Sequence, residues 1–122
     1  MEKYKATITE IGELAEELLQ QGMMVLFNNT APAELREISI IHSGGVLKSD
    51  LQVGDKLFIG KKMYTVTAIG KVANKNLKKI GHACLKFDAK TCPDLPGDVH
   101  LKGEKVSSVK LGDLIQIKNS QN

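Results

Sequence analysis

Residues 56–68 read Lys56-Leu57-Phe58-Ile59-Gly60-Lys61-Lys62-Met63-Tyr64-Thr65-Val66-Thr67-Ala68. Two apolar runs rich in β-branched and aromatic residues flank a Gly-Lys turn, where Gly60 supplies the positive φ that a tight turn requires. The pattern predicts a β-hairpin. On either side of it, alternating or short apolar patterns predict further strands at residues 4–9, 23–27, 38–43, 82–88, 98–102 and 114–118.

Short helical stretches separate some of these strands. Apolar residues follow helical spacing over residues 11–19, and Gly22 would end that helix. Helical turns are expected at residues 32–37, where Pro32 takes the first position, and at 76–80, before Gly81. Many short strands at close spacing predict an all-β fold, a small closed or nearly closed β-barrel with one or two short helical segments.

One turn pattern recurs along the chain. Gly-Asp precedes a strand in Leu51-Gln52-Val53-Gly54-Asp55, in Val109-Lys110-Leu111-Gly112-Asp113 and in Pro96-Gly97-Asp98. The aspartate side chain can accept hydrogen bonds from nearby backbone N–H groups, which suits a turn that starts a strand. We interpret the recurrence as turn chemistry used again, not as the sign of a repeat protein.

Length and composition are those of an ordinary soluble domain. The 122 residues predict a single domain, 1–122, which can bury a core without metals or disulfides. No apolar run reaches the roughly 20 residues that cross a bilayer, and the N-terminus lacks the apolar centre of a signal peptide. We therefore expect a cytoplasmic protein with Cys84 and Cys92 as reduced thiols. Their spacing matches no zinc motif, and the sequence indicates no cofactor or structural metal.

The charge balance argues against nucleic acid as a partner. The net charge is +3, from 17 basic and 14 acidic residues, and only 4% of residues are aromatic. Nucleic-acid-binding domains usually have a larger, clustered basic excess and, for single strands, aromatic stacking platforms. Lysines gather locally at Lys61-Lys62 and at Lys75, Lys78 and Lys79. Each group is either solvated surface or a patch for an acidic partner.

His42 is the residue best suited to chemistry. It would share a strand face with Ile38 and Ile40, and Ser43-Gly44-Gly45 follows it. A neutral imidazole is a nucleophile near pH 7, and glycines would let backbone N–H groups reach phosphoryl oxygens. Lys48 is close enough in sequence to add positive charge. The same residues also fit a partly buried polar cap at a strand end, so both interpretations stand at this point.

The other candidate side chains carry weaker signals. His82 would share a strand face with Cys84 and Lys86, and His100 with Asp98, so we expect both histidines at the surface or rim. A site with three histidine ligands for a metal has no supporting spacing. Ser43 would point away from His42, and no nucleophile elbow surrounds it, so a hydrolase pair is not indicated.

Five segments carry a family resemblance that covers essentially the whole chain. They are Ala31-Pro32-Ala33-Glu34-Leu35 with Ile41-His42-Ser43-Gly44-Gly45-Val46-Leu47-Lys48; Tyr64-Thr65-Val66-Thr67-Ala68-Ile69-Gly70; Asn76-Leu77 through Gly81-His82; Leu85-Lys86-Phe87-Asp88; and Pro96-Gly97-Asp98-Val99-His100. The ordered series resembles the glucitol/sorbitol-specific IIA component of the phosphoenolpyruvate-dependent sugar phosphotransferase system. Some relatives have a second histidine two places after the first, where this chain has Gly44.

The resemblance implies a function and a site. It implies a phosphocarrier that accepts a phosphoryl group on His42 from the phosphocarrier HPr and passes it to the IIB domain of a sorbitol transporter. The IIB and IIC membrane components would be its partners, without nucleic acid and without direct membrane insertion. Candidate neighbours of His42 are Ser43, Gly44, Gly45, Lys48 and His82.

Such a carrier would present its imidazole to two partners. We therefore expect His42 to be accessible, beside an exposed apolar patch. The alternative is a non-catalytic β-barrel module that binds a protein or ligand.

Overall fold

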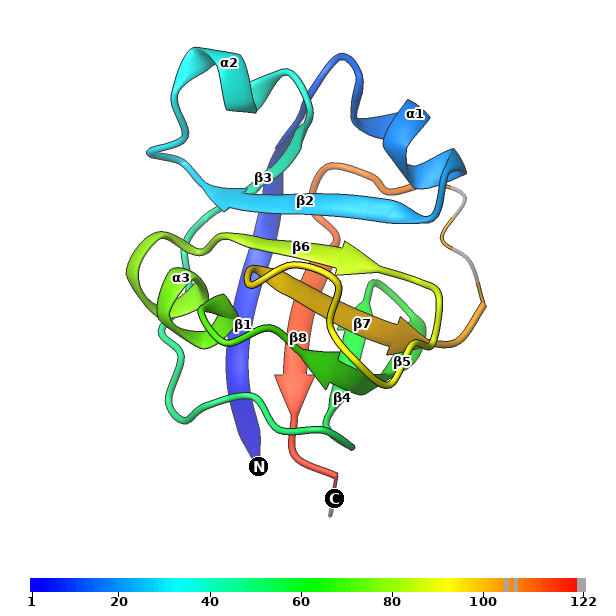
Figure 1. Cartoon of the computed structure of the whole chain (residues 1–122). Helices are drawn as coiled ribbons and strands as arrows, with labels where there is room; N and C mark the ends of the chain where they lie inside the picture. The colour runs from blue at the N-terminus through cyan, green and yellow to red at the C-terminus, as the bar shows by residue number, and fades with distance from the viewer. Residues whose placement is uncertain (105, 107, 121–122) are drawn as a thin grey trace.

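The computed structural model describes residues 1–104, 106 and 108–120. Within this part of the chain, eight strands form a closed barrel in the order β1-β3-β2-β6-β7-β5-β4-β8, and β8 pairs back onto β1 (Figure 1). The strands are β1 (Glu2–Ile11), β2 (Met23–Asn28), β3 (Ser39–His42), β4 (Lys56–Ile59), β5 (Lys62–Ile69), β6 (Ala83–Lys86), β7 (Asp98–Lys102) and β8 (Leu114–Lys118). The expected β-barrel is confirmed.

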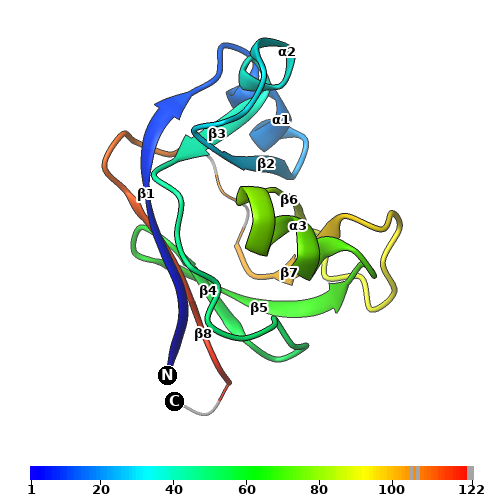
Figure 2. The same cartoon turned by 90° about the vertical axis from the view of Figure 1, so that its left-hand side faces the viewer.

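Three short helices are present in the described residues, where one or two helical segments were expected. They are α1 (Ala15–Gln20), α2 (Ala33–Arg36) and α3 (Ala73–Ile80). The helices α1 and α2 lie beyond β2 and β3 at one end of the barrel, whereas α3 lies along its side next to β6 (Figure 2). Each connects two strands of the barrel, so all three are parts of strand connections.

The hairpin predicted at residues 56–68 is β4 and β5. The two strands are antiparallel, with Ile59 opposite Lys62, and Gly60 has φ 59° in the turn between them. Strand β6 is shorter than the alternation of residues 82–88 suggests. His82 leaves the ladder because its N–H donates to the Asn76 carbonyl at 3.2 Å, capping α3, and the N–H of Phe87 donates to Gly22 at 2.9 Å.

The barrel interior is an aliphatic core completed by two tyrosines. Inward-facing residues of successive strands are almost fully buried, among them Tyr4, Ile40, Tyr64, Leu101 and Ile115. Alternation along each strand sends every second side chain inward. A second, smaller cluster of Phe27, Ala31 and Ile41 packs outside this core under α2.

The barrel contains an internal two-fold repeat with a spacing of 58 to 59 residues. Ile8 pairs with His42 across β1 and β3, and Val66 pairs with Leu101 across β5 and β7; the same bulge follows each pair. The turn glycines repeat as well, because Gly54 donates to Val66 and Gly112 donates to Ile8, each at 2.8 Å. Two of the three Gly-Asp turns, at Gly54 and Gly112, thus belong to a repeat of the whole pairing pattern, although we interpreted the recurrence as turn chemistry alone.

Candidate functional site around His42

His42 ends β3 with its side chain on the inner face of the barrel. Its backbone lies between Ile8 of β1 and Asn28 of β2. The imidazole is fully buried, at 0% exposure, and the Tyr4 ring meets it edge-on with centroids 6.0 Å apart. The expectation that His42 is accessible is therefore wrong for this conformation, because Tyr4 and the backbone of Gly44 and Gly81 surround the ring.

Both ring nitrogens of His42 are bonded to backbone groups. Gly44 donates its N–H to Nδ1 at 3.0 Å, and Nε2 lies 2.8 Å from the carbonyl oxygen of Gly81. A carbonyl can only accept and an amide N–H can only donate, so Nε2 carries the proton and Nδ1 carries the lone pair. The two bonds hold the ring in one tautomer and one orientation.

Burial also controls the charge of this imidazole. Desolvation lowers the pKa of His42 below its ordinary value of 6.5, and the hydrogen bond to Gly81 opposes part of that effect. Burial disfavours the protonated ring because a charge loses its hydration there. His42 is therefore neutral near pH 7, the form in which imidazole has a nucleophilic lone pair.

Gly81 packs directly against the His42 ring and leaves no space for a side chain. It caps α3 in the left-handed conformation, with φ 61° and ψ 26°, and its N–H donates to Leu77 at 3.1 Å. A Cβ built at Gly81 would lie 2.5 Å from Cε1 and 2.8 Å from Nε2 of His42. Backbone conformation and ring packing therefore both require glycine here.

The loop after His42 is fastened to α3. Asn74 of α3 accepts the Leu51 N–H at 2.7 Å and returns a bond to the Leu51 carbonyl at 3.3 Å. Further along, the buried Lys3 ammonium bonds Asp55 at 2.7 Å and the Asp50 carbonyl at 3.0 Å. The segments that hold Nδ1 and Nε2 are thus tied to each other as well as to the ring.

The sequence-predicted neighbours occupy different positions. Ser43 is exposed and its Oγ accepts the Thr7 N–H at 3.0 Å, while Gly45 donates to the Tyr4 hydroxyl at 3.3 Å. The glycine N–H groups expected to cradle a phosphoryl group therefore bind the ring and Tyr4 in this structure. Lys48 is exposed, and no contact of its ammonium group is seen within the described residues.

Comparison with known proteins places this arrangement in a family. Residues 3–116 match the family model described as the PTS system glucitol/sorbitol-specific IIA component, where PTS denotes the phosphotransferase system. The chain belongs to this IIA family. Two relatives named as PTS glucitol/sorbitol-specific EIIA components, from Shigella flexneri and Escherichia coli K12, are each 37% identical over 116 residues, covering 95% of this chain and 94% of theirs.

A solved structure supports the IIA assignment at the level of the fold. The crystal structure of a PTS system IIA component from Enterococcus faecalis V583 superposes with a TM-score of 0.78 at 31% identity, covering 91% of this chain and 96% of that one. Among the described residues of this IIA protein, none of the helices has the length and apolar character needed to span a membrane.

In this IIA protein His82 directly follows Gly81, the residue whose carbonyl oxygen contacts His42, but its ring lies in a different setting. It is half-buried, and its ring stacks on Phe27 of the outer cluster with centroids 4.7 Å apart. Its Nδ1 donates to the Leu26 carbonyl at 2.9 Å, which leaves the lone pair on Nε2. The expected rim position is confirmed, and His82 belongs to the outer cluster, not to the core that surrounds His42.

His100 was expected at the surface or rim and is instead fully buried. Its Nδ1 bonds the Asp88 carboxylate at 2.8 Å, and its Nε2 accepts the Asp94 N–H at 3.3 Å. Asp98 lies 3.8 Å from Nε2 and pairs with Lys86 at 2.8 Å. The ring fastens the loop between β6 and β7, which sequence alternation could not show because Asp88 and Asp94 lie outside the strands.

The residues missed by sequence reasoning are those that surround the imidazole. Tyr4 and Gly81 both touch the His42 ring, although they lie 38 and 39 positions away along the chain. Gly81 did leave a signal as the glycine that ends a helical turn, but nothing in the sequence links that turn to His42. The three histidines do not come together in the described residues, where the ligand atoms of Asp88, Asp94 and His100 are those that lie within 4.8 Å of one another.

Proposed function

We propose that this chain, acting as one unit over residues 1–122, carries a phosphoryl group on His42 from phospho-HPr to the IIB domain of a sorbitol transporter. Its IIA family and the names of its relatives support the reaction class and the sugar. The observation that carries the residue assignment is the His42 ring, held neutral in one tautomer beside the exposed Gly44. Since HPr is a soluble partner, the reaction would take place in the cytoplasm.

In phosphoryl transfer the main task of the protein is to position the reacting groups. A lone pair of the neutral His42 ring attacks phosphorus, and the N–P bond on HPr breaks with its electron pair returning to the HPr imidazole. In the onward transfer a nucleophile of the IIB domain attacks phosphorus, the N–P bond on His42 breaks, and its electron pair returns to the His42 ring. Phosphoryl transfer depends mainly on positioning and charge stabilisation, and the apolar surroundings of His42 limit access of water to the phosphoramidate.

The resting geometry adds a requirement. Each ring nitrogen of His42 is engaged, so a phosphoryl group can be accepted only after one of the two backbone bonds opens. The Ser43–Gly44 stretch is exposed, so its displacement would uncover the ring without unpacking the core. Val46 lies on the same loop and is 75% exposed, so its apolar side chain is available for contact with a partner protein.

The experiment that tests this function follows label from phosphoenolpyruvate through Enzyme I and HPr. We expect the wild-type chain to gain one phosphoryl group, acid-labile and base-stable, in intact mass spectrometry. His42→Ala should gain none, because a methyl group cannot form a phosphoramidate. His82→Ala and His100→Ala should still accept the group. Thermal melting of each variant checks that it is folded.

Two results would overturn the proposal. A folded wild-type chain that gains no mass would favour a binding module without chemistry. Labelling of His42→Ala at the wild-type rate, together with loss in His82→Ala or His100→Ala, would reassign the phosphorylated residue while leaving the carrier function. Transfer onward to the IIB domain, measured by loss of label from the chain, tests the acceptor separately.

A further inference from the structure

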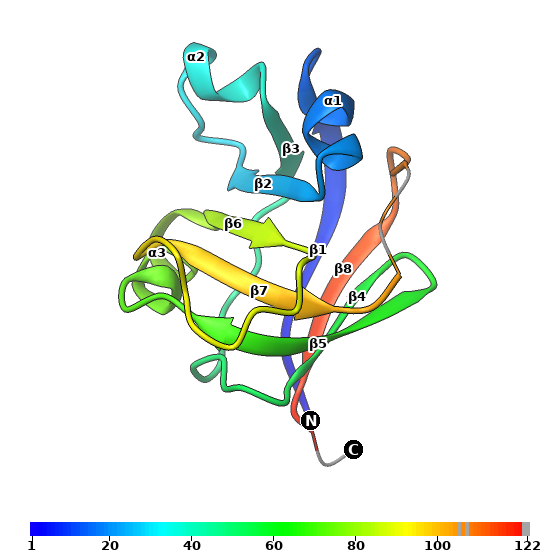
Figure 3. The ribbon, with the colours of Figure 1, turned by 45° about the vertical axis from the view of Figure 1, so that its right-hand side comes forward.

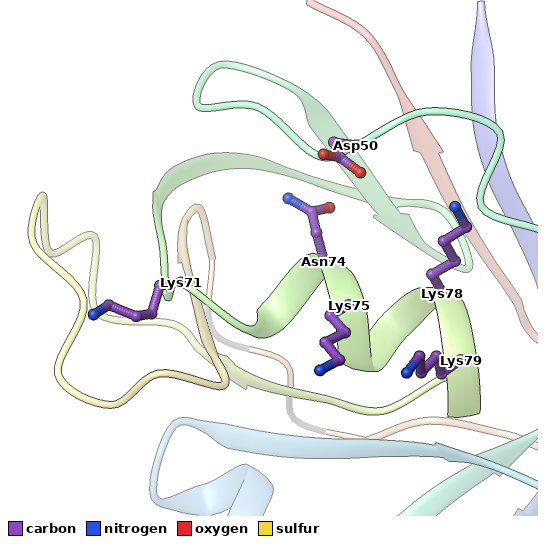
Figure 4. A pocket seen from close by; sticks show the side chains of 6 residues that line it. All are labelled: Asp50, Lys71, Asn74, Lys75, Lys78 and Lys79. Atoms are coloured by element: carbon purple, nitrogen blue, oxygen red, sulfur yellow. The ribbon is translucent and has the colours of Figure 1, made fainter.

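An open hollow lies between α3 and the loop that follows His42. It has a volume of about 630 Å³ and is lined by Asp50, Lys71, Asn74, Lys75, Lys78 and Lys79. Figure 4 shows Asp50 opposite Asn74, with Lys71 on the segment that precedes α3 and Lys78 towards the far end of the helix. All four lysines are exposed. We call this group of four lysines the lysine face of α3.

The lysine face has a positive charge that the described residues do not neutralise. No carboxylate within that part of the chain forms an ion pair with any of the four, whereas Lys86 and Lys90 nearby in sequence both pair with Asp94. Asp50 is the single acidic residue lining the hollow. Four unpaired ammonium groups on so short a segment repel each other, which favours an external partner of opposite charge.

The position of the face connects it to the site. Helix α3 is capped by Gly81, whose carbonyl oxygen accepts a hydrogen bond from Nε2 of His42. The other wall of the hollow belongs to the loop after His42, in which Gly44 donates to Nδ1. Asn74, within the hollow, ties the two walls together through Leu51. A protein that approaches the His42 loop would therefore also meet the lysine face.

We propose that the lysine face of α3 is a docking surface for an acidic protein surface, on a protein that exchanges the phosphoryl group with His42. The inference rests on the proposed function. Lysines that diverge along α3 and the segment before it match carboxylates spread over a protein surface better than one small anion (Figure 4). No large exposed apolar residue of the described chain lies on α3 for insertion into a lipid surface.

Such a surface acts mainly on the encounter between partners. Complementary charge raises association rates, and added salt removes the effect. The second-order rate constant of phosphoryl transfer should therefore depend on the lysine face and on ionic strength. The rate within the docked complex should not, because these lysines do not contact the His42 ring.

The test compares charge reversal on two sides of the barrel. Lys71→Glu/Lys75→Glu changes one lysine just before α3 and one in its first turn, where acidic residues favour a helix, so folding should be preserved. The matched control is Lys61→Glu/Lys62→Glu in the β4–β5 turn, which lies on the opposite side of the barrel from α3 (Figure 3). Both variants change the net charge equally. Transfer from phospho-HPr and transfer to the IIB domain are measured separately at low and high salt.

We expect the α3 variant to lower the second-order rate constant of at least one transfer by roughly tenfold or more at low salt, as lost steering does. The difference should shrink at high salt, and the β4–β5 control should stay close to wild type. Equal effects of both variants, or no effect of the α3 variant on either transfer, would overturn the proposal. Binding to anionic lipid vesicles is measured as well. If the α3 variant loses vesicle binding while both transfer rates stay unchanged, the lysine face binds a lipid surface and the proposal is overturned.

Failure of the carrier function can be told apart from failure of the docking surface. If the wild-type chain accepts no phosphoryl group, the binding of unphosphorylated HPr and of the IIB domain is measured directly by titration calorimetry. Weaker binding of either protein by the α3 variant alone would then support the docking surface. Binding that is the same for both variants would reject it.

Discussion

A side chain at Gly81 would collide with His42: a Cβ there would lie 2.5 Å from Cε1 of the imidazole. Gly81 thus caps α3, accepts the hydrogen bond from Nε2–H of His42 through its carbonyl oxygen, and sets the space that the ring occupies. The contact joins two segments 39 positions apart, and it can be tested by substitution.

Gly81→Ala should destabilise the protein and slow phosphoryl acceptance. An alanine in the left-handed region costs roughly 1–2 kcal/mol, and the clash with the His42 ring should add about 1–3 kcal/mol. The matched control is Gly22→Ala, with φ 84° and nothing within 4 Å of the built Cβ. Urea unfolding should show the larger loss for Gly81→Ala, and label transfer should slow only in that variant. Equal losses would mean that the ring contact contributes nothing.

The unfolding free energy should depend on pH through His42. Burial lowers the pKa of His42 in the folded state below the ordinary 6.5, so the unfolded chain binds the proton more tightly. The contribution of the neutral His42 ring to the free energy of unfolding is fully present above about pH 6.5. It is lost as the pH falls towards the folded-state pKa, so that the free energy of unfolding changes by at most about 1.4 kcal/mol per pH unit. Urea unfolding of wild type and His42→Ala between about pH 7.5 and about pH 5.5 should show the slope reduced in the variant.

Asp55→Ala should be among the most damaging single substitutions outside the site. It would leave the Lys3 ammonium, whose side chain is 6% exposed, without its carboxylate partner. Breaking a buried ion pair by removing one partner costs about 3–5 kcal/mol. Asp113→Ala is the control, because Asp113 occupies the equivalent turn and its carboxylate accepts only the Lys110 N–H among its described contacts.

The same pair allows a rescue experiment. Adding Lys3→Met to Asp55→Ala removes the unpaired buried charge, so part of the lost stability should return. Denaturant unfolding of the single and double variants measures the difference. A double variant no more stable than Asp55→Ala would show that the damage comes from the lost Gln52 turn bond to Asp55, which is 2.8 Å long.

The two cysteines should react with thiol reagents at very different rates. Burial, with Asp98 nearby, raises the pKa of Cys84 to about 11, whereas Cys92 is exposed. The thiolate is the reactive form, so at about pH 8 one thiol should react rapidly and the second slowly. Cys92→Ser should remove the rapid phase. A rapid phase that survives in this variant would contradict the burial of Cys84.

The strands could be predicted from sequence because each leaves a local pattern. Alternation placed β4, β5, β7 and β8 to within a residue or two, and Gly60 marked the hairpin turn. Strands β2 and β3 pair in parallel, as do β6 and β7. Alternation within one strand carries no information about which strand pairs with which, or in which direction. The number of strands therefore predicts that a barrel closes, whereas the order in which the strands pair is visible only in the structure.

At the candidate site, the sequence singles out His42 but does not show what surrounds its ring. His42 stood out because it precedes Ser43-Gly44-Gly45 and matches a family signature. Its burial depends on Tyr4 and Gly81, whose approach is set by the closure of the barrel. The same reason explains His100, where partners from the β6–β7 loop enclose a ring that strand alternation placed at the surface.

The internal repeat suggests that the order of the strands can be rearranged. Met1 and Asn119 exchange two hydrogen bonds, of 3.2 and 3.1 Å, so the described ends of the barrel already lie together. Joining them and opening the chain at Gly60 would give a circular permutant that begins with β5 and ends with β4. Because β5 and β8 hold the places of β1 and β4 in the repeat, the permuted connectivity would match the present one. His42 would then lie in the second half of the chain, in an unchanged barrel.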